Sequence, residues 1–157
     1  MRIAIGADKG GFALKNLLCK YLEDKGLAVT DYGIFDLDKP NCYPASASAV
    51  ATAIQKGEAE RGILVCGSGM GMAITANKHK GVYAAVVESV YATRMCRQVN
   101  NANVLCLGAM ILGEGMAREM VDVFLSTDFL SGLEEWRFEL LTNQFSLLGT
   151  IEERAFR

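Results

Sequence analysis

The chain has 157 residues, 51% of them hydrophobic, and this length predicts one domain, spanning 1–157, with an apolar core of its own. Lys and Arg total 16 against 18 for Asp and Glu, and aromatic residues make up 8%, which argues against nucleic-acid binding because both a basic field and a stacking surface are missing. No stretch approaches about 18 consecutive apolar residues, so we expect no membrane contact and a soluble protein.

The first half of the chain alternates strands with helices. Strands predicted from their apolar character alternate with segments in which apolar residues recur at helical spacing. Gly26 closes the first helix, and Pro44 suits the first turn of the second. The predicted elements are strands at 2–7, 28–32 and 63–66 and helices at 12–24 and 44–56.

The second half continues this alternation. It predicts a helix ending near residue 78, strands at 82–87 and 104–107, and helices at 91–99 and 114–125. Continuous apolar strands are typical of a parallel sheet that is covered on both faces. We therefore predict a three-layer α/β/α Rossmann-like sandwich with about five parallel strands.

The C-terminal segment 133–157 is predicted to be a helical extension. It carries more apolar side chains than a free terminal helix would expose: Trp136, Phe138, Leu140, Leu141, Phe145, Leu147 and Leu148. Two interpretations stay open, docking on a partner subunit and packing against its own domain.

The five cysteines are scattered along the chain and form no Cys-x-x-Cys pair. This pattern fits neither a disulfide framework nor a zinc site. It favours reduced thiols in a cytoplasmic protein.

A glycine-rich turn follows the third predicted strand and reads Cys66-Gly67-Ser68-Gly69-Met70-Gly71. Alternating glycines at a strand-to-helix turn bring the backbone close to a ligand and direct its N–H groups toward an anion. The same setting favours a thiolate, so Cys66 could take a proton from a carbon beside a carbonyl while the turn stabilises the enediolate oxygen. The alternative is a buried structural cysteine at the end of an apolar strand.

Dinucleotide binding is a rival interpretation of the same turn. Glu88 closes the next strand, where a ribose-binding acid could lie. Two features argue against it: Met72 stands where the usual fingerprint has its third glycine, and the motif follows the third strand instead of the first.

Several segments together resemble the ribose-5-phosphate isomerase type B family, which also contains the subunits of galactose-6-phosphate isomerase. The resemblance covers nearly the whole chain, and the order and spacing of the segments are specific. It is carried by residues 2–15, 31–33, 43–44, 62–71, 76–78 and 100–108.

This resemblance implies a Rossmann-like fold, a homodimer or tetramer with active sites shared between subunits, and no metal or organic cofactor. It implies proton transfer between C1 and C2 through an enediolate, with Cys66 as base and Ser68 beside it. The implied substrate-binding residues are Asp8, Lys9, Tyr43, Gly67, Gly69, Gly71, Asn100 and, donated by the neighbouring subunit, Arg137. Without the family, Asp8 would be interpreted as a helix N-cap and Arg137 as a solvated surface charge.

The chain departs from the family pattern at several positions. Lys9 stands where the family has His, and Val99 stands where a ring-opening His is usual. Arginine is common at three positions that hold Tyr83, Met110 and Leu133 here, so the predicted phosphate site is reduced to Lys9 and Arg137. The single histidine, His79, lies between two lysines and is predicted to be a solvated turn residue.

The sequence therefore predicts a cofactor-free aldose–ketose isomerase for a phosphorylated sugar of the ribose 5-phosphate type. An isomerase of erythrose 4-phosphate or a tetrulose phosphate is one alternative, because such sugars cannot close a five-membered ring and need no ring-opening group at position 99. A galactose-6-phosphate isomerase-like subunit is another. The non-enzyme alternative is a sugar-phosphate- or nucleotide-binding module.

Overall fold

The computed structural model describes residues 1–39 and 41–156 and contains one parallel five-stranded sheet in the order β2-β1-β3-β5-β4. The predicted strands are confirmed, although the fourth is shorter than 82–87 because the Val82 amide bonds to the His79 carbonyl in a turn (3.1 Å). The strands are β1 Arg2–Ala7, β2 Ala28–Asp31, β3 Arg61–Cys66, β4 Ala84–Val86 and β5 Val104–Gly108.

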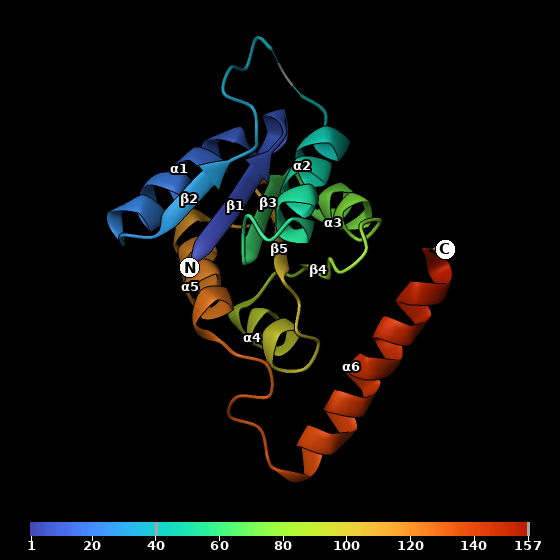
Figure 1. The fold of residues 1–157 in the computed structure, drawn as a ribbon. Coiled ribbons are helices and arrows are strands. Elements are labelled where there is room, and N and C mark those ends of the chain that lie inside the picture. Colours follow the sequence, from blue (N-terminus) through green and yellow to red (C-terminus); the bar gives the residue numbers. More distant parts are fainter. Residues whose placement is uncertain (40, 157) are drawn as a thin grey trace.

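Helices cover both faces of the sheet, so the predicted three-layer α/β/α architecture is confirmed (Figure 1). One face packs against α1 Phe12–Asp24, α4 Val90–Gln98 and α5 Glu114–Ser126. The other packs against α2 Tyr43–Gln55 and α3 Met70–Ala76. A 3-10 turn, η1 Lys9–Gly11, joins β1 to α1.

The core follows the alternation of side chains along the strands. In β3, Ile63 and Val65 point toward α1 and α5, whereas Leu64 and Cys66 point toward α2 and α3. All four are buried. Cys66 therefore ends its strand on the α2–α3 side of the sheet.

Chain connections run outward from the centre of the sheet in both directions. β1 is flanked by β2 on one side and by β3 on the other. The carboxyl ends of β1 and β3 therefore form the switch point, where doubly wound sheets bind their ligands.

The C-terminal helix α6 Trp136–Ala155 confirms the predicted helical extension and stands apart from the layered body in Figure 1. It touches its own chain at the β4 edge, where the Phe145 ring lies 5.3 Å from the Tyr83 ring and the Glu152 carboxylate accepts from the Gly81 amide at 2.6 Å. Leu141 is the one described α6 residue that is buried. Apolar side chains at positions 136, 147 and 151 stay exposed.

Across the described residues, no helix has both the length and the hydropathy needed to cross a membrane.

Candidate active site

The turn between β3 and α3 holds the thiol of Cys66 at the carboxyl edge of the sheet. Cys66 is 7% exposed, and its Sγ accepts a hydrogen bond from the Gly69 amide at 3.1 Å. A backbone donor at this distance stabilises a thiolate. Ser68 is half-buried on the same turn, with its hydroxyl 3.5 Å from the Met70 amide. A thiol, a hydroxyl and backbone donors thus lie within one short segment.

Gly69 is the residue that allows this turn to form. Its φ is +79°, a left-handed conformation that side chains other than glycine rarely adopt. A Cβ there would lie 2.8 Å from Val86 Cγ2 and 3.1 Å from the Leu107 carbonyl carbon. The turn is therefore packed directly against β4 and β5.

Asp8 and the glycines after it form the neighbouring wall. Asp8 Oδ1 accepts from the Gly11 amide at 3.1 Å, so Asp8 is the N-cap that its residue type suggests. A Cβ on Gly11 would lie 2.2 Å from the Val65 carbonyl oxygen, and one on Gly10 would lie 3.1 Å from the Gly67 nitrogen. The β1 and β3 turns are therefore in close contact, and exposed Lys9 lies beside them.

Tyr43 closes the α2 side of the site. It is the first residue of α2, and its ring packs directly on Gly71. A Cβ added to Gly71 would lie 2.8 Å from Tyr43 Cε2. The structure thus brings seven of the predicted site residues, with Lys9 at the rim, into one region, which we call the carboxyl-edge site. Its members are Asp8, Tyr43, Cys66, Gly67, Ser68, Gly69 and Gly71.

The rim of the carboxyl-edge site is apolar beside the glycine turn. Met110 is 82% exposed, and its Sδ lies 3.3 Å from the position of a Cβ on Gly67. Ile111 is also exposed, and it packs on Gly108 at the end of β5. A methionine thioether gives this rim no positive charge.

Asn100 and Arg137 do not join this site within the chain. Asn100 follows α4, which returns to the amino edge of the sheet, where the Asn103 carbonyl accepts from the Gly62 amide at 2.9 Å. A five-residue strand spans about 16 Å, so the sheet separates Asn100 from Cys66. Arg137 lies in the first turn of α6, the helix that stands apart from the layered body in Figure 1.

Val99 and Asn100 instead meet α6. Together with Gln144, Phe145 and Leu148 they line a cavity of 110 Å³. Arg137 lies seven residues before Gln144, two turns along the same helix face. We call Val99, Asn100, Arg137 and Gln144 the amino-edge cluster.

Three of the other cysteines are held as thiols. Burial, with Asp31 nearby, raises the pKa of Cys19 to about 11, and burial raises the pKa of Cys96 to about 11. Burial also raises the pKa of Cys106, which lies on β5. The hydrogen bonds of the buried thiols also differ, because Cys66 Sγ accepts from the Gly69 amide whereas Cys96 Sγ donates to the Thr93 carbonyl oxygen at 3.1 Å.

His79 corrects one prediction in part. It lies in the turn after α3, as predicted, but it is half-buried against α2 and α3 instead of fully solvated. One ring nitrogen lies 2.9 Å from the Ser48 hydroxyl and the other 3.3 Å from the Thr75 carbonyl oxygen. Its flanking lysines are exposed, which explains why local composition was misleading.

Some residues that build the site were not identified as site residues from their sequence pattern. Gly10, Gly11 and Ser46 act by close packing and by one hydrogen bond to the end of β1, described below, so no local pattern marks them. The one local signal of a polar network beside the site is Lys15, a lysine that lies within the apolar face of the first helix.

A doubly wound parallel sheet with a thiol and a glycine-rich turn at its switch point defines a Rossmann-like α/β protein whose ligand site is expected at this edge. The profile of the Ribose/Galactose Isomerase family matches residues 3–141. The chain belongs to this family and is an isomerase, which confirms the predicted family and enzyme class.

Individual relatives refine this assignment. A 4-deoxy-4-sulfo-D-erythrose isomerase from Clostridium sp. (strain MSTE9) is 47% identical over 157 residues, covering 100% of this chain and 99% of the relative. A D-erythrulose-4-phosphate isomerase from Pectobacterium atrosepticum is 42% identical over 132 residues, 84% of this chain and 87% of the relative. The solved structure of ribose-5-phosphate isomerase B from Clostridium thermocellum matches with a TM-score of 0.90 at 36% identity, covering 99% of each chain.

Proposed function

We propose that the enzyme interconverts the aldose and ketose forms of an open-chain four-carbon sugar that carries an anionic group on C4, with a sulfonate preferred to a phosphate. Such a sugar has no free C4 hydroxyl and cannot close a five-membered ring. It therefore needs no group that opens a ring.

The observation that carries this proposal is the surroundings of Val99. Valine cannot transfer a proton, and the other residues that line its cavity are Asn100, Gln144, Phe145 and Leu148. Among the described residues at this cavity, none has a side chain that titrates near neutral pH. A cyclic pentose or hexose phosphate would lack a ring-opening acid or base here, whereas an open-chain tetrose would not be affected.

The small number of proposed cations at the site supports a sulfonate over a phosphate as the anionic group of the substrate. A sulfonate carries one negative charge, whereas a phosphate monoester carries about −1.5 to −2 at neutral pH. Met110 and Leu133 supply no charge, which leaves Lys9 and Arg137 as the proposed cations. The relative that acts on 4-deoxy-4-sulfo-D-erythrose is similar over the whole chain, which agrees with this inference.

In the proposed mechanism, the Cys66 thiolate removes the proton from C2 of the aldose. The electron pair of the C2–H bond forms the C1–C2 double bond, and the carbonyl electrons move to O1 to give an enediolate. Backbone N–H groups of the 67–71 turn stabilise the negative oxygen, and Ser68 transfers protons between O1 and O2. Return of the proton to C1 gives the ketose. Atoms and electrons balance within the substrate, so this step consumes no co-reactant.

We further propose that two chains complete each site. Asn100 and Arg137 lie across the sheet from Cys66 of their own chain, and α6 exposes apolar side chains that a partner would cover. In a homodimer or tetramer, the amino-edge cluster of one subunit would face the carboxyl-edge site of another. Asp8 and Tyr43 would then contact the sugar from one chain and Asn100 from the other.

The test is a comparison of kcat/KM for 4-deoxy-4-sulfo-D-erythrose, D-erythrose 4-phosphate, D-ribose 5-phosphate and D-galactose 6-phosphate. We expect the two tetroses to exceed the two cyclic sugars by about 10² or more, the usual value of one acid–base group, with the sulfonate first. Val99→His should raise kcat/KM for ribose 5-phosphate and leave the tetroses unchanged. A native preference for ribose 5-phosphate, with no gain in Val99→His, would contradict the proposal.

A further inference from the structure

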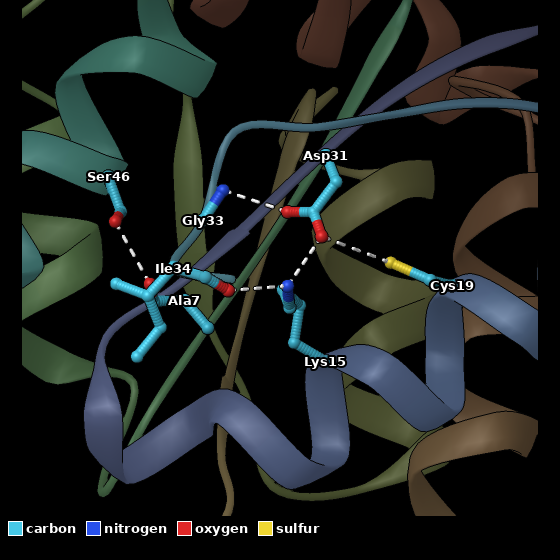
Figure 2. A network of polar contacts seen from close by, with 7 residues as sticks. All are labelled: Ala7, Lys15, Cys19, Asp31, Gly33, Ile34 and Ser46. Atoms are coloured by element: carbon cyan, nitrogen blue, oxygen red, sulfur yellow. Dashed lines mark hydrogen bonds and ion pairs between the residues drawn. The ribbon is translucent and has the colours of Figure 1, made fainter. Parts of the chain in front are cut away.

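Lys15 is a cation with no solvent exposure, and the mechanism does not use it directly. It lies in α1, within the apolar face that also buries Leu14 and Leu18. Its Nζ bonds to Asp31 Oδ2 and donates to the Ile34 carbonyl oxygen at 2.9 Å (Figure 2). The rings of Phe12 and Phe35 flank it at 5.4 and 5.1 Å from their centroids. Every direction around this ammonium group is therefore occupied.

Asp31 connects Lys15 to the turn after β2, because its two carboxylate oxygens have different partners. Its other oxygen, Oδ1, accepts from the Gly33 amide at 2.8 Å, which bends the chain immediately beyond the strand. The bend lays Gly33 against the end of β1, where an added Cβ would lie 2.7 Å from the Ala7 nitrogen and 3.0 Å from Lys15 Cδ. The Ile34 amide then bonds to the Ala7 carbonyl oxygen at 3.4 Å.

Ala7 is the junction of this network, as Figure 2 shows. Its carbonyl oxygen also accepts from the buried Ser46 hydroxyl at 2.9 Å. Ser46 lies one turn after Tyr43 in α2, and Ala7 directly precedes Asp8. Asp8 and Tyr43, the two proposed sugar contacts, are thus both connected to Ala7, the first by the peptide bond and the second through Ser46 of the same helix.

Few other bonds fix the β2–α2 connection. Over 33–39, 41 and 42, the hydrogen bonds that hold the segment on β1, β2 and α1 are those of Gly33 to Asp31, Ile34 to Ala7 and Lys15 to Ile34. At the other end of the segment, the Cys42 carbonyl oxygen accepts from the Ala45 and Ser46 amides in the first turn of α2 (3.1 and 3.4 Å). Bonds of Asp36 and Asn41 stay within the segment. The chain that leaves β2 is therefore held on the sheet through the Lys15–Asp31 pair, and α2 holds its far end.

An ion pair with one fully buried member, Lys15, and one partly exposed member, Asp31, is a poor means of gaining stability, because removing the lysine charge from water offsets much of the attraction between the two groups. A pair of apolar residues would fill the same volume. The hydrogen bonds of this pair, in contrast, have a fixed direction and length.

We infer that Lys15 and Asp31 are a positioning pair for the reaction: they hold the 31–34 turn on Ala7, and through Ala7 they set Asp8 and Tyr43 against the sugar. The inference rests on the proposed function only in taking Asp8 and Tyr43 as sugar contacts. Displacement of such contacts by about 1 Å can cost as much as 10² in rate.

The test uses the charge-neutral double variant Lys15→Met/Asp31→Asn, in which Asn can still accept from the Gly33 amide. We expect kcat/KM to fall about 10- to 100-fold, with the thermal midpoint changed by only a few degrees. The rate is measured on whichever sugar the native enzyme isomerises fastest, so an error in the proposed substrate would not appear as a failure of this inference. Hydrogen exchange should rise in 32–46 and stay unchanged in β3 and α5.

The matched control is Lys25→Met. Lys25 is the C-cap residue of the same helix and also pairs with an aspartate, Asp122, but it is exposed and lies at the amino edge of the sheet. Its kcat/KM should stay within about twofold of native. Gly33→Ala provides a second variant if the double variant fails to fold, because it keeps both charges and displaces the turn from Ala7.

The decisive readout is coupling to Tyr43. If the pair acts through Tyr43, the double variant should lose less activity in a Tyr43→Phe background than in the native one. A purely structural role predicts that the fold losses in kcat/KM from the double variant and from Tyr43→Phe multiply when the changes are combined. Losses that multiply, or native kcat/KM in the folded double variant or in folded Gly33→Ala, would overturn the inference.

Discussion

The carboxyl-edge site and the amino-edge cluster are built in different ways. In the first, Cys66 is buried and bonded to the Gly69 amide, and the turns after β1 and β3 leave no space for a Cβ between them. In the second, Asn100 is exposed and α6 presents apolar side chains to solvent. One region is organised by its own chain, whereas the other has the composition of a surface that a partner covers.

This difference separates two tasks. Proton transfer requires donors held in place before the substrate arrives, because reorganisation during the reaction raises the barrier. Recognition of the far end of the sugar tolerates groups supplied by a second subunit. The region organised within one chain should therefore control kcat, and the region that we propose to be completed between chains should control substrate choice and assembly.

The largest expected effect is at Cys66. Cys66→Ala should lower kcat by about 10² to 10⁴, the range for loss of a general base, with an unchanged circular dichroism spectrum. Cys106→Ala is the matched control, because it removes a buried thiol from the adjacent strand and should leave kcat near native. Near-native turnover in Cys66→Ala would move the base to another residue.

The glycine turn should be the next most sensitive feature. Gly69→Ala places a Cβ 2.8 Å from Val86 in a left-handed residue, so the turn must shift and kcat should fall about 10- to 100-fold. Gly115→Ala, on a helix with no atom within 4 Å of the added Cβ, should keep native activity. Equal activity in the two variants would show that the turn is not organised for catalysis.

A smaller effect concerns alkaline stability near the amino-edge cluster, where Cys96 lies on α4. Its pKa of about 11 is above the ordinary value of 9.0, because burial disfavours the thiolate. The folded state thus binds this proton more tightly than the unfolded state, and the stabilisation is complete below pH 9 and lost as the pH rises through 11.

Urea unfolding at pH 8, 9 and 10 checks this prediction. The free energy of unfolding should decrease with pH less steeply in Cys96→Ala than in the native protein. Cys42→Ala, which removes an exposed thiol, should show the native slope. An unchanged slope in Cys96→Ala would show that this thiol does not contribute.

The sequence predicted the elements and the glycine turn because both depend on local patterns. Strands of continuous apolar residues, Gly69 before a helix and a long apolar tail are all visible within about ten residues. The Lys15–Asp31 pair could not be predicted, because its partners lie 16 residues apart and the one local signal, a lysine within the apolar face of the first helix, does not identify the partner. The burial of His79 was mispredicted for a related reason, since its partner Ser48 lies 31 residues earlier. Long-range contacts of polar residues were what the sequence did not show.

The central proposal is that each active site is divided between two chains. Cys66→Ala and Arg137→Ala subunits, each inactive alone, should be mixed under conditions of confirmed subunit exchange and assayed on the sugar that the native enzyme isomerises fastest. Each hybrid dimer then contains one site with both native residues, so we expect recovery of about a quarter of native activity. No recovery, with hybrid dimers demonstrated by native mass spectrometry, would contradict the account.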